Sequence, residues 1–134
     1  MTTQNLLVIG WAAVLLLLSL ALAARPSLPA KPLYLMAFVL GTLLPLQEFV
    51  PWLLVHGLRV DAFLQAVDTN AIARFFKWDV LTGLGTLLVL VVVESRRTGM
   101  RVAWPALLFG FLVGVSSGLP LFLYLRERQL ERRH

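Results

Sequence analysis

The sequence predicts an all-α integral membrane protein, folded as one bundle of four transmembrane helices. Three observations predict this fold: 59% of the residues are hydrophobic, only 14% are charged, and four long apolar runs are free of charge except at Glu48 and at their margins. An ordinary soluble domain carries about 25% charged residues, whereas a membrane-spanning helix needs about 20 mainly apolar residues. We therefore expect a single membrane domain over residues 1–134, with spans at about 6–24, 33–55, 75–94 and 102–125.

The first run, residues 6–24, contains no charge and would span about 28 Å as a helix. Ala21, Leu22 and Ala23 form an A-x-A pattern, so a cleaved signal peptide is the alternative interpretation. The basic segment that precedes a signal core is missing and the run is longer than such a core, which favours a retained span. Three prolines within residues 26–32 then end the helix, because proline removes a backbone donor and crowds the preceding turn.

The second run, residues 33–55, is long enough to span, but it contains Pro45 and Pro51. A kinked helix is expected there. Between this run and the next, Val60, Phe63 and Val67 recur at helical spacing. This spacing predicts a short amphipathic helix at the membrane surface.

The third charge-free run, residues 80–93, covers only about 21 Å as a helix, less than the roughly 30 Å of a hydrocarbon core. Residues 75–79 must therefore be drawn into the span, which places Asp79 inside it. The fourth run, residues 102–125, is long enough to cross with some tilt.

Basic residues indicate the orientation of such a chain. In a four-span topology five lie on the side of the two short loops and seven on the side of the chain ends, so we expect both termini in the cytoplasm. The five are Arg25, Lys31, Arg96, Arg97 and Arg101, and the seven are Arg59, Arg74, Lys77, Arg126, Arg128, Arg132 and Arg133.

The absence of cysteine excludes disulfides, thiol redox chemistry, iron–sulfur clusters and cysteine-bound zinc. Two histidines are too few for a histidine cage, so no metal site and no cofactor are expected. The net charge of +5 comes largely from arginines beside apolar runs, where they meet lipid headgroups. The bilayer is therefore the expected partner, and nucleic acid is not.

Glu48, Asp79 and Ser116 reach a similar depth, about 22 Å from the short-loop face if each run is a straight helix. Ionisable groups at membrane depth are costly and usually face a bundle interior, so Glu48 and Asp79 are the candidate catalytic groups. The alternative is that both lie at the interface and pair with Arg74 or Lys77. The candidate binding residues around this layer are Trp52, Trp78, Thr82, Ser116 and Ser117.

Gly110, Gly114 and Gly118 repeat every four residues in the fourth run. Such spacing lets another helix approach closely, so we predict a helix-packing stripe. The partner is expected within the chain, although a second copy of the chain would fit the same pattern.

A diffuse set of residues between positions 33 and 126 resembles a bacterial family of small membrane proteins of unknown function. The resemblance implies a multi-pass protein of the bacterial inner membrane, but it implies no activity. The first helix would be an addition to the family core, and Glu48 is not one of the family positions. The residues that carry the resemblance are Gly41, Pro45, Phe49, His56, Gly57, Asp79, Glu94, 114–116 and 119–126.

A weaker similarity links the string from Pro45 to Phe49 with membrane terpene and carotenoid cyclases. It implies an isoprenoid cyclase in which an intramembrane carboxyl donates a proton to an alkene and Trp52 or Trp78 stabilises a carbocation. A small transporter is a further alternative, although the first run lacks the essential glutamate of small multidrug transporters. The leading interpretation is a bundle that packs with another membrane protein or holds a hydrophobic, lipid-like small molecule, and whether it is an enzyme stays open.

Overall fold

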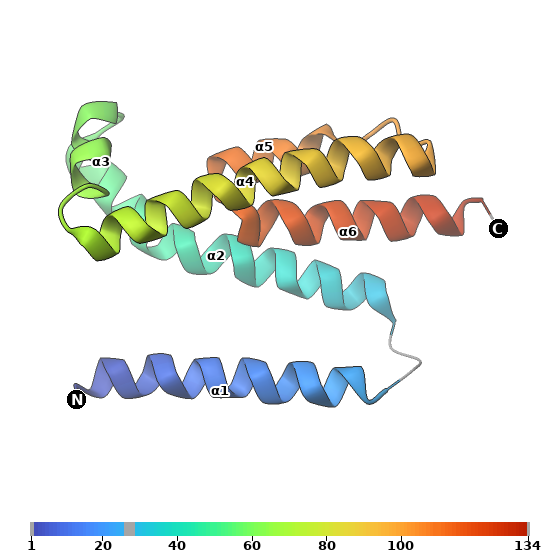
Figure 1. Cartoon of the computed structure of the whole chain (residues 1–134), viewed down its shortest axis with the longest axis horizontal. Helices are drawn as coiled ribbons and strands as arrows, with labels where there is room; N and C mark the ends of the chain where they lie inside the picture. Colours follow the sequence, from blue (N-terminus) through green and yellow to red (C-terminus); the bar gives the residue numbers. More distant parts are fainter. Residues whose placement is uncertain (1, 26–28, 134) are drawn as a thin grey trace.

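The computed structural model describes residues 2–25 and 29–133, which form six helices and no strand. The prediction of an all-α fold is confirmed for this part of the chain. Figure 1 shows the helices lying roughly along one axis, with the short α3 across one end. In order they are α1 (Thr3–Ala23), α2 (Ala30–His56), α3 (Val60–Ala66), α4 (Ala71–Thr98), α5 (Trp104–Leu112) and α6 (Val115–Glu131).

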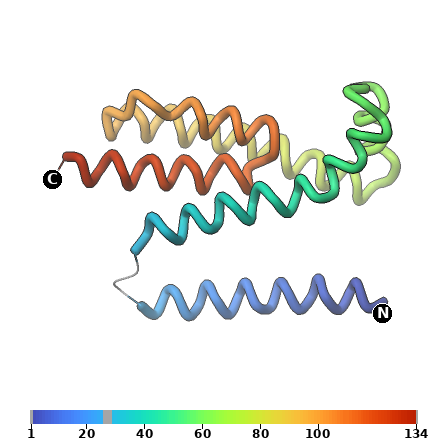
Figure 2. The backbone as a smooth tube through the Cα atoms, turned by 180° about the vertical axis from the view of Figure 1, so that it is seen from behind, coloured from blue at the N-terminus to red at the C-terminus, as the bar shows by residue number. Residues whose placement is uncertain are grey.

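Three of these helices, α1, α2 and α4, are long and apolar enough to cross a membrane. The helix α1 has no buried residue, and it lies apart from the other five helices (Figures 1 and 2). The helix α2 continues through Pro45 and Pro51. The helix α4 begins at Ala71, where Asn70 caps it by accepting a hydrogen bond from the amide of Ala73. It therefore includes residues 75–79, and the place of Asp79 inside a membrane span stays a prediction.

Residues 102–125 do not form the single helix that was expected for the fourth span. The run is divided between α5 and α6, and the chain reverses at Val113 and Gly114. Gly114 has a φ of +136°, a backbone conformation that other residues rarely adopt. The two helices then lie side by side as an antiparallel hairpin (Figure 2).

Glycines allow the two arms of this hairpin to touch. A Cβ atom added at Gly118 would lie 2.7 Å from the Cα of Gly110 and 2.6 Å from the carbonyl oxygen of Ala106. Gly110 and Gly118 are therefore packing residues within the chain. They face each other across a turn instead of forming a stripe along one helix. Gly114 stands at the turn itself, where its φ is the requirement and the nearest atom to an added Cβ is 3.8 Å away.

The tip of the hairpin reaches the middle of the bundle. The Ser116 hydroxyl donates a hydrogen bond of 3.0 Å to the carbonyl of Gly41, a residue about 17 Å along α2 from its start. On the other side, Val115 lies against Gly83, near the middle of α4. The hairpin thus enters from the end where α4 finishes and returns to the same end.

The reversal moves the C-terminal end of the chain. Figure 1 shows the end of α6 at the same end of the structure as the start of α2 and the end of α4, opposite the start of α1. The start of α1 and the end of α6 thus lie at opposite ends of the structure, whereas both termini were expected on one side of the membrane; the side of the membrane on which each end lies stays a prediction.

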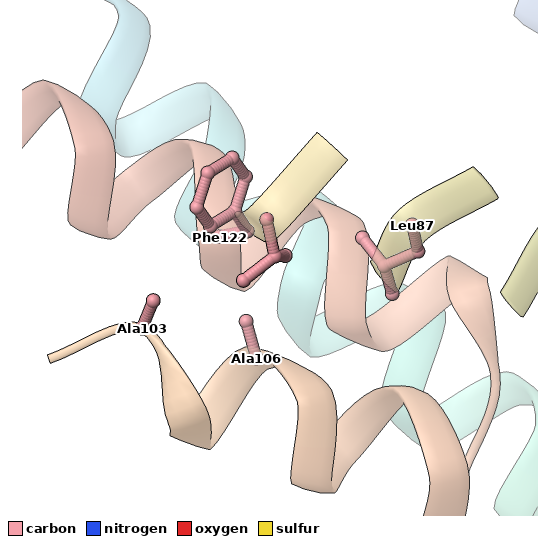
Figure 3. Close-up of a cluster of buried hydrophobic side chains, with 5 residues drawn as sticks. Leu87, Ala103, Ala106 and Phe122 are labelled. Atoms are coloured by element: carbon pink, nitrogen blue, oxygen red, sulfur yellow. The ribbon is translucent and has the colours of Figure 1, made fainter. Parts of the chain in front are cut away.

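A small core lies where α4 meets the hairpin. It consists of Leu87, Val91, Ala103, Ala106 and Phe122, four of which are labelled in Figure 3. The helix α6 is central to the packing because it contacts α2, α4 and α5, whereas α2 and α4 are not a packed pair. Towards its end, α6 is linked to α4 by the ion pair of Arg126 and Glu94, at 2.7 Å.

The close approach of the hairpin arms predicts opposite effects for two glycine substitutions. Gly118→Ala should destabilise the protein by about 1–3 kcal/mol, because the new methyl group must push α5 and α6 apart. The control Gly85→Ala, where an added Cβ meets no atom within 4 Å, should be neutral or slightly stabilising, since alanine favours a helix. Thermal unfolding of the purified variants in one detergent checks this pair, and equal stability of the two variants would contradict the packing.

Candidate functional site

An apolar cavity of about 520 Å³ lies beyond the tip of the hairpin. Its walls come from α2, α3 and α4, and the turn between α5 and α6 closes one side. The volume is in the range of typical small-molecule pockets, about 300–1,000 Å³. The wall residues include Pro45, Leu46, Phe49, Trp52 and Leu53 from α2, Phe63 from α3, Val80, Leu81 and Leu84 from α4, and residues 110–114 from the hairpin.

Aromatic rings form the wall of this cavity nearest α3. Phe49 and Trp52 are stacked with their centroids 6.1 Å apart, and Phe63 meets both edge-on at 6.0 Å. On its far side Trp52 stacks on His56 at 4.5 Å. These contacts join α3 to the end of α2 and give one end of the cavity an aromatic surface.

A second, more polar cavity of about 640 Å³ adjoins the first. Asp79, Thr82 and Thr86 from α4 and Ser116 from α6 supply its polar groups. The two cavities share Pro45, Val80, Val113 and Gly114 as lining residues, so they meet at the turn of the hairpin.

The backbone at this turn forms its hydrogen bonds within the hairpin. The amide of Gly114 donates to the carbonyl of Phe109, and the carbonyl of Gly114 accepts from the amides of Ser117 and Gly118. Non-helical backbone is tolerated at membrane depth only where protein covers it or where it lines a cavity. Val113 and Gly114 line both cavities, which meets this condition.

Residues 33–128 match the model of a protein family described as "Protein of unknown function DUF2834". The chain belongs to this family. No curated protein and no solved structure matches the chain, so nothing supports the similarity to terpene cyclases. The DUF2834 segment begins in α2 and ends in α6, and it therefore contains the hairpin and both cavities but not α1.

Within the DUF2834 segment, the structure separates the two candidate carboxylates. Asp79 lines the polar cavity together with Thr82 and Ser116, whereas Glu48 lines neither cavity, and both acidic residues are exposed. The sequence predicted only that the two carboxylates lie at a similar depth. The direction in which each side chain leaves its helix determines which of them lines the cavity. The expected shared cavity therefore contains only Asp79.

The basic residues expected beside Asp79 are used elsewhere. The ammonium of Lys77 donates a hydrogen bond of 2.7 Å to the carboxylate of Asp68, and the Arg74 guanidinium donates to the backbone carbonyl of Asp68 at 3.3 Å. The hydrogen bond from Lys77 holds the pKa of the Asp68 carboxyl below its ordinary value. Both cations thus secure the α3–α4 link.

The remaining candidates have different positions. Trp52 lines the apolar cavity, but Trp78 is exposed and lines neither cavity. Ser117 is fully buried, and its hydroxyl lies 2.7 Å from that of Thr42, so it joins α6 to α2. The sequence analysis did not predict Phe49 and Phe63 as site residues. Phe49 lies three residues before Trp52, and Phe63 lies three residues after Val60, so the helical spacing was visible in the sequence. The cavity beside them could not be predicted, because the reversal of the chain at Gly114 creates it.

The geometry predicts opposite behaviour for two acidic residues of α4. Among the described residues no cation lies within 4.0 Å of Asp79, so Asp79→Asn should not lower the thermal stability, since it removes the cost of an unpaired charge at depth. Glu94→Gln should lower it, because the ion pair that links α4 to α6 is lost and Arg126 keeps only Glu127 of its own helix. Melting curves of both variants in the same detergent check this, and a loss at Asp79 as large as that at Glu94 would contradict it.

Proposed function

We propose that this DUF2834 protein is a multi-pass membrane protein that holds a hydrophobic, lipid-like chain in the apolar cavity. The single observation that carries the proposal is the cavity of about 520 Å³ between α2, α3, α4 and the hairpin tip. Its apolar and aromatic lining suits an acyl or isoprenoid chain. A molecule of this kind can enter from the surrounding lipid.

The proposed topology is three spans and a re-entrant hairpin. The helices α1, α2 and α4 have the length and hydropathy to cross the bilayer, and the hairpin of α5 and α6 enters and leaves on one side. A hairpin of this kind satisfies the rule for non-helical backbone at membrane depth, since its turn faces cavities and protein. These three spans and the hairpin replace the four spans that hydropathy alone predicts.

This topology also supports an orientation. Nine basic residues lie at the end of the bundle that holds the hairpin's entry point, and three lie at the α3 end. Cytoplasmic loops carry an excess of lysine and arginine, so we place the C-terminal end in the cytoplasm and the start of α1 on the other side. The nine are Arg25, Lys31, Arg96, Arg97, Arg101, Arg126, Arg128, Arg132 and Arg133, and the three are Arg59, Arg74 and Lys77.

The bacterial inner membrane is the proposed location, supported by the family resemblance of residues 33–126. An enzyme or a transporter is not proposed. The carboxylate of the cyclase-like string, Glu48, lines neither cavity, and Asp79 lacks a second titratable group beside it in the polar cavity. Packing with another membrane protein stays a prediction, for which the unburied α1 is the available surface.

Photolabelling tests the proposed ligand class directly. A fatty acid carrying a diazirine is incorporated into liposomes with the full chain, and the labelled peptides are mapped by mass spectrometry. We expect labelling at residues 45–63 and 80–84 that unlabelled oleic acid competes away. Labelling of α1, which has no buried residue, should not be competed in this way.

A pair of variants controls for labelling by bulk lipid. Leu81→Trp places a larger side chain in the cavity wall and should reduce the competed labelling. Leu88→Trp lies two turns further along α4, lines neither cavity, and should leave it unchanged. Competed labelling that survives Leu81→Trp, or labelling that is uniform along all apolar helices, would contradict the proposal.

A further inference from the structure

A third hollow, of about 450 Å³, lies at the opposite end of the bundle from the apolar cavity. Residues 99–102 of the α4–α5 link form one wall, and the last two turns of α6 form the other. Arg101 comes from the link, Arg128 comes from α6, and Arg132 is the residue that follows the last residue of α6, so three arginines line one space. Arg128 and Arg132 share a face of α6 because they are four residues apart.

The acidic residues at this end are already paired with other cations. Glu94 contacts Arg97 and Arg126, and Glu127 contacts Arg126. Glu131 accepts a hydrogen bond of 2.6 Å from Lys31.

The arginines of the hollow have no such partners. Within residues 2–25 and 29–133, no carboxylate lies within 4.0 Å of the Arg101, Arg128 or Arg132 side chains. The hollow therefore has a concentrated positive charge that the described part of the chain does not neutralise.

The chemistry of the hollow fits a phosphate group. The planar guanidinium donates paired hydrogen bonds to phosphate oxygens, and arginine is preferred over lysine for this contact. All of the charged groups that line the hollow are arginines. Basic pockets between membrane helices on the cytoplasmic side are known to take phospholipid headgroups.

We propose that this hollow binds the phosphate of an anionic phospholipid headgroup. Met100, Val102 and Leu125 line the same space as the three arginines, so a charged rim and an apolar surface occur together. A lipid matches both, with its phosphate on the arginines and the start of its acyl chains against the apolar residues. A free phosphate ion would use only the rim.

The experiment titrates the detergent-solubilised full chain with three probes and follows its thermal unfolding. The probes are phosphatidylglycerol, diacylglycerol with the same acyl chains, and inorganic phosphate. We expect stabilisation by phosphatidylglycerol at concentrations where the other two have little effect. Equal stabilisation by diacylglycerol would overturn the phosphate contact, and equal stabilisation by inorganic phosphate would overturn the lipid as its source.

Two double variants with the same change in net charge locate the site. Arg128→Gln/Arg132→Gln should weaken the apparent affinity for phosphatidylglycerol about 25-fold, from about fivefold for each arginine removed. Arg25→Gln/Arg96→Gln removes two cations from the same end that do not line the hollow, and should weaken it far less. An equal loss of affinity in the two double variants would show general attraction of the lipid to the charged surface and would overturn the proposed site. If a variant is unstable, native mass spectrometry of its folded fraction gives the same comparison of bound phosphatidylglycerol.

Discussion

The close contact between α5 and α6 is the constraint on which the rest of the structure depends. Because Gly118 has no side chain, its backbone meets that of Ala106 and Gly110 at distances that a Cβ atom on Gly118 would prevent, and a Cβ atom on Gly110 would meet the Leu87 side chain at 2.9 Å. The chain can then reverse at Gly114, and α6 returns between α2 and α4 to contact both. The buried side chains of Ala106 and Phe122, one from each arm, are brought together by the same contact.

The hairpin also determines where the bundle is hollow. Its turn stops near the middle of α2 and α4, where Ser116 donates to the Gly41 carbonyl and Ser117 meets Thr42. Hydrogen bonds between helices at membrane depth contribute about 0.6 kcal/mol on average, so these contacts fix the position of the turn more than they stabilise the fold. Beyond the turn, the two adjoining cavities lie between residues of α2 and α4.

Hydropathy and helical spacing predicted α1, α2, α3 and α4 because each follows from local composition. The hairpin could not be predicted in this way, since a charge-free run of residues 102–125 fits either one tilted span or two short antiparallel helices. Glycines at positions 110, 114 and 118 are equally ambiguous: the spacing suits a stripe along one helix and also two arms that face each other across a central turn. Asp79 and Glu48 show a second limit of prediction from the sequence. The rise per residue gives the depth of each residue along its helix, but the packing of neighbouring helices determines which side chain lines a cavity.

The proposed re-entrant topology predicts that both ends of the hairpin lie on one side of the membrane. Because the chain contains no cysteine, single cysteine variants can test this. Arg101→Cys lies in the α4–α5 link and Arg133→Cys follows α6, so each is placed at one foot of the hairpin. In sealed membrane vesicles of known orientation, a membrane-impermeant maleimide should label both positions from the same side and label Thr3→Cys only from the other. Labelling of positions 101 and 133 from opposite sides would show a continuous fourth span and contradict the hairpin.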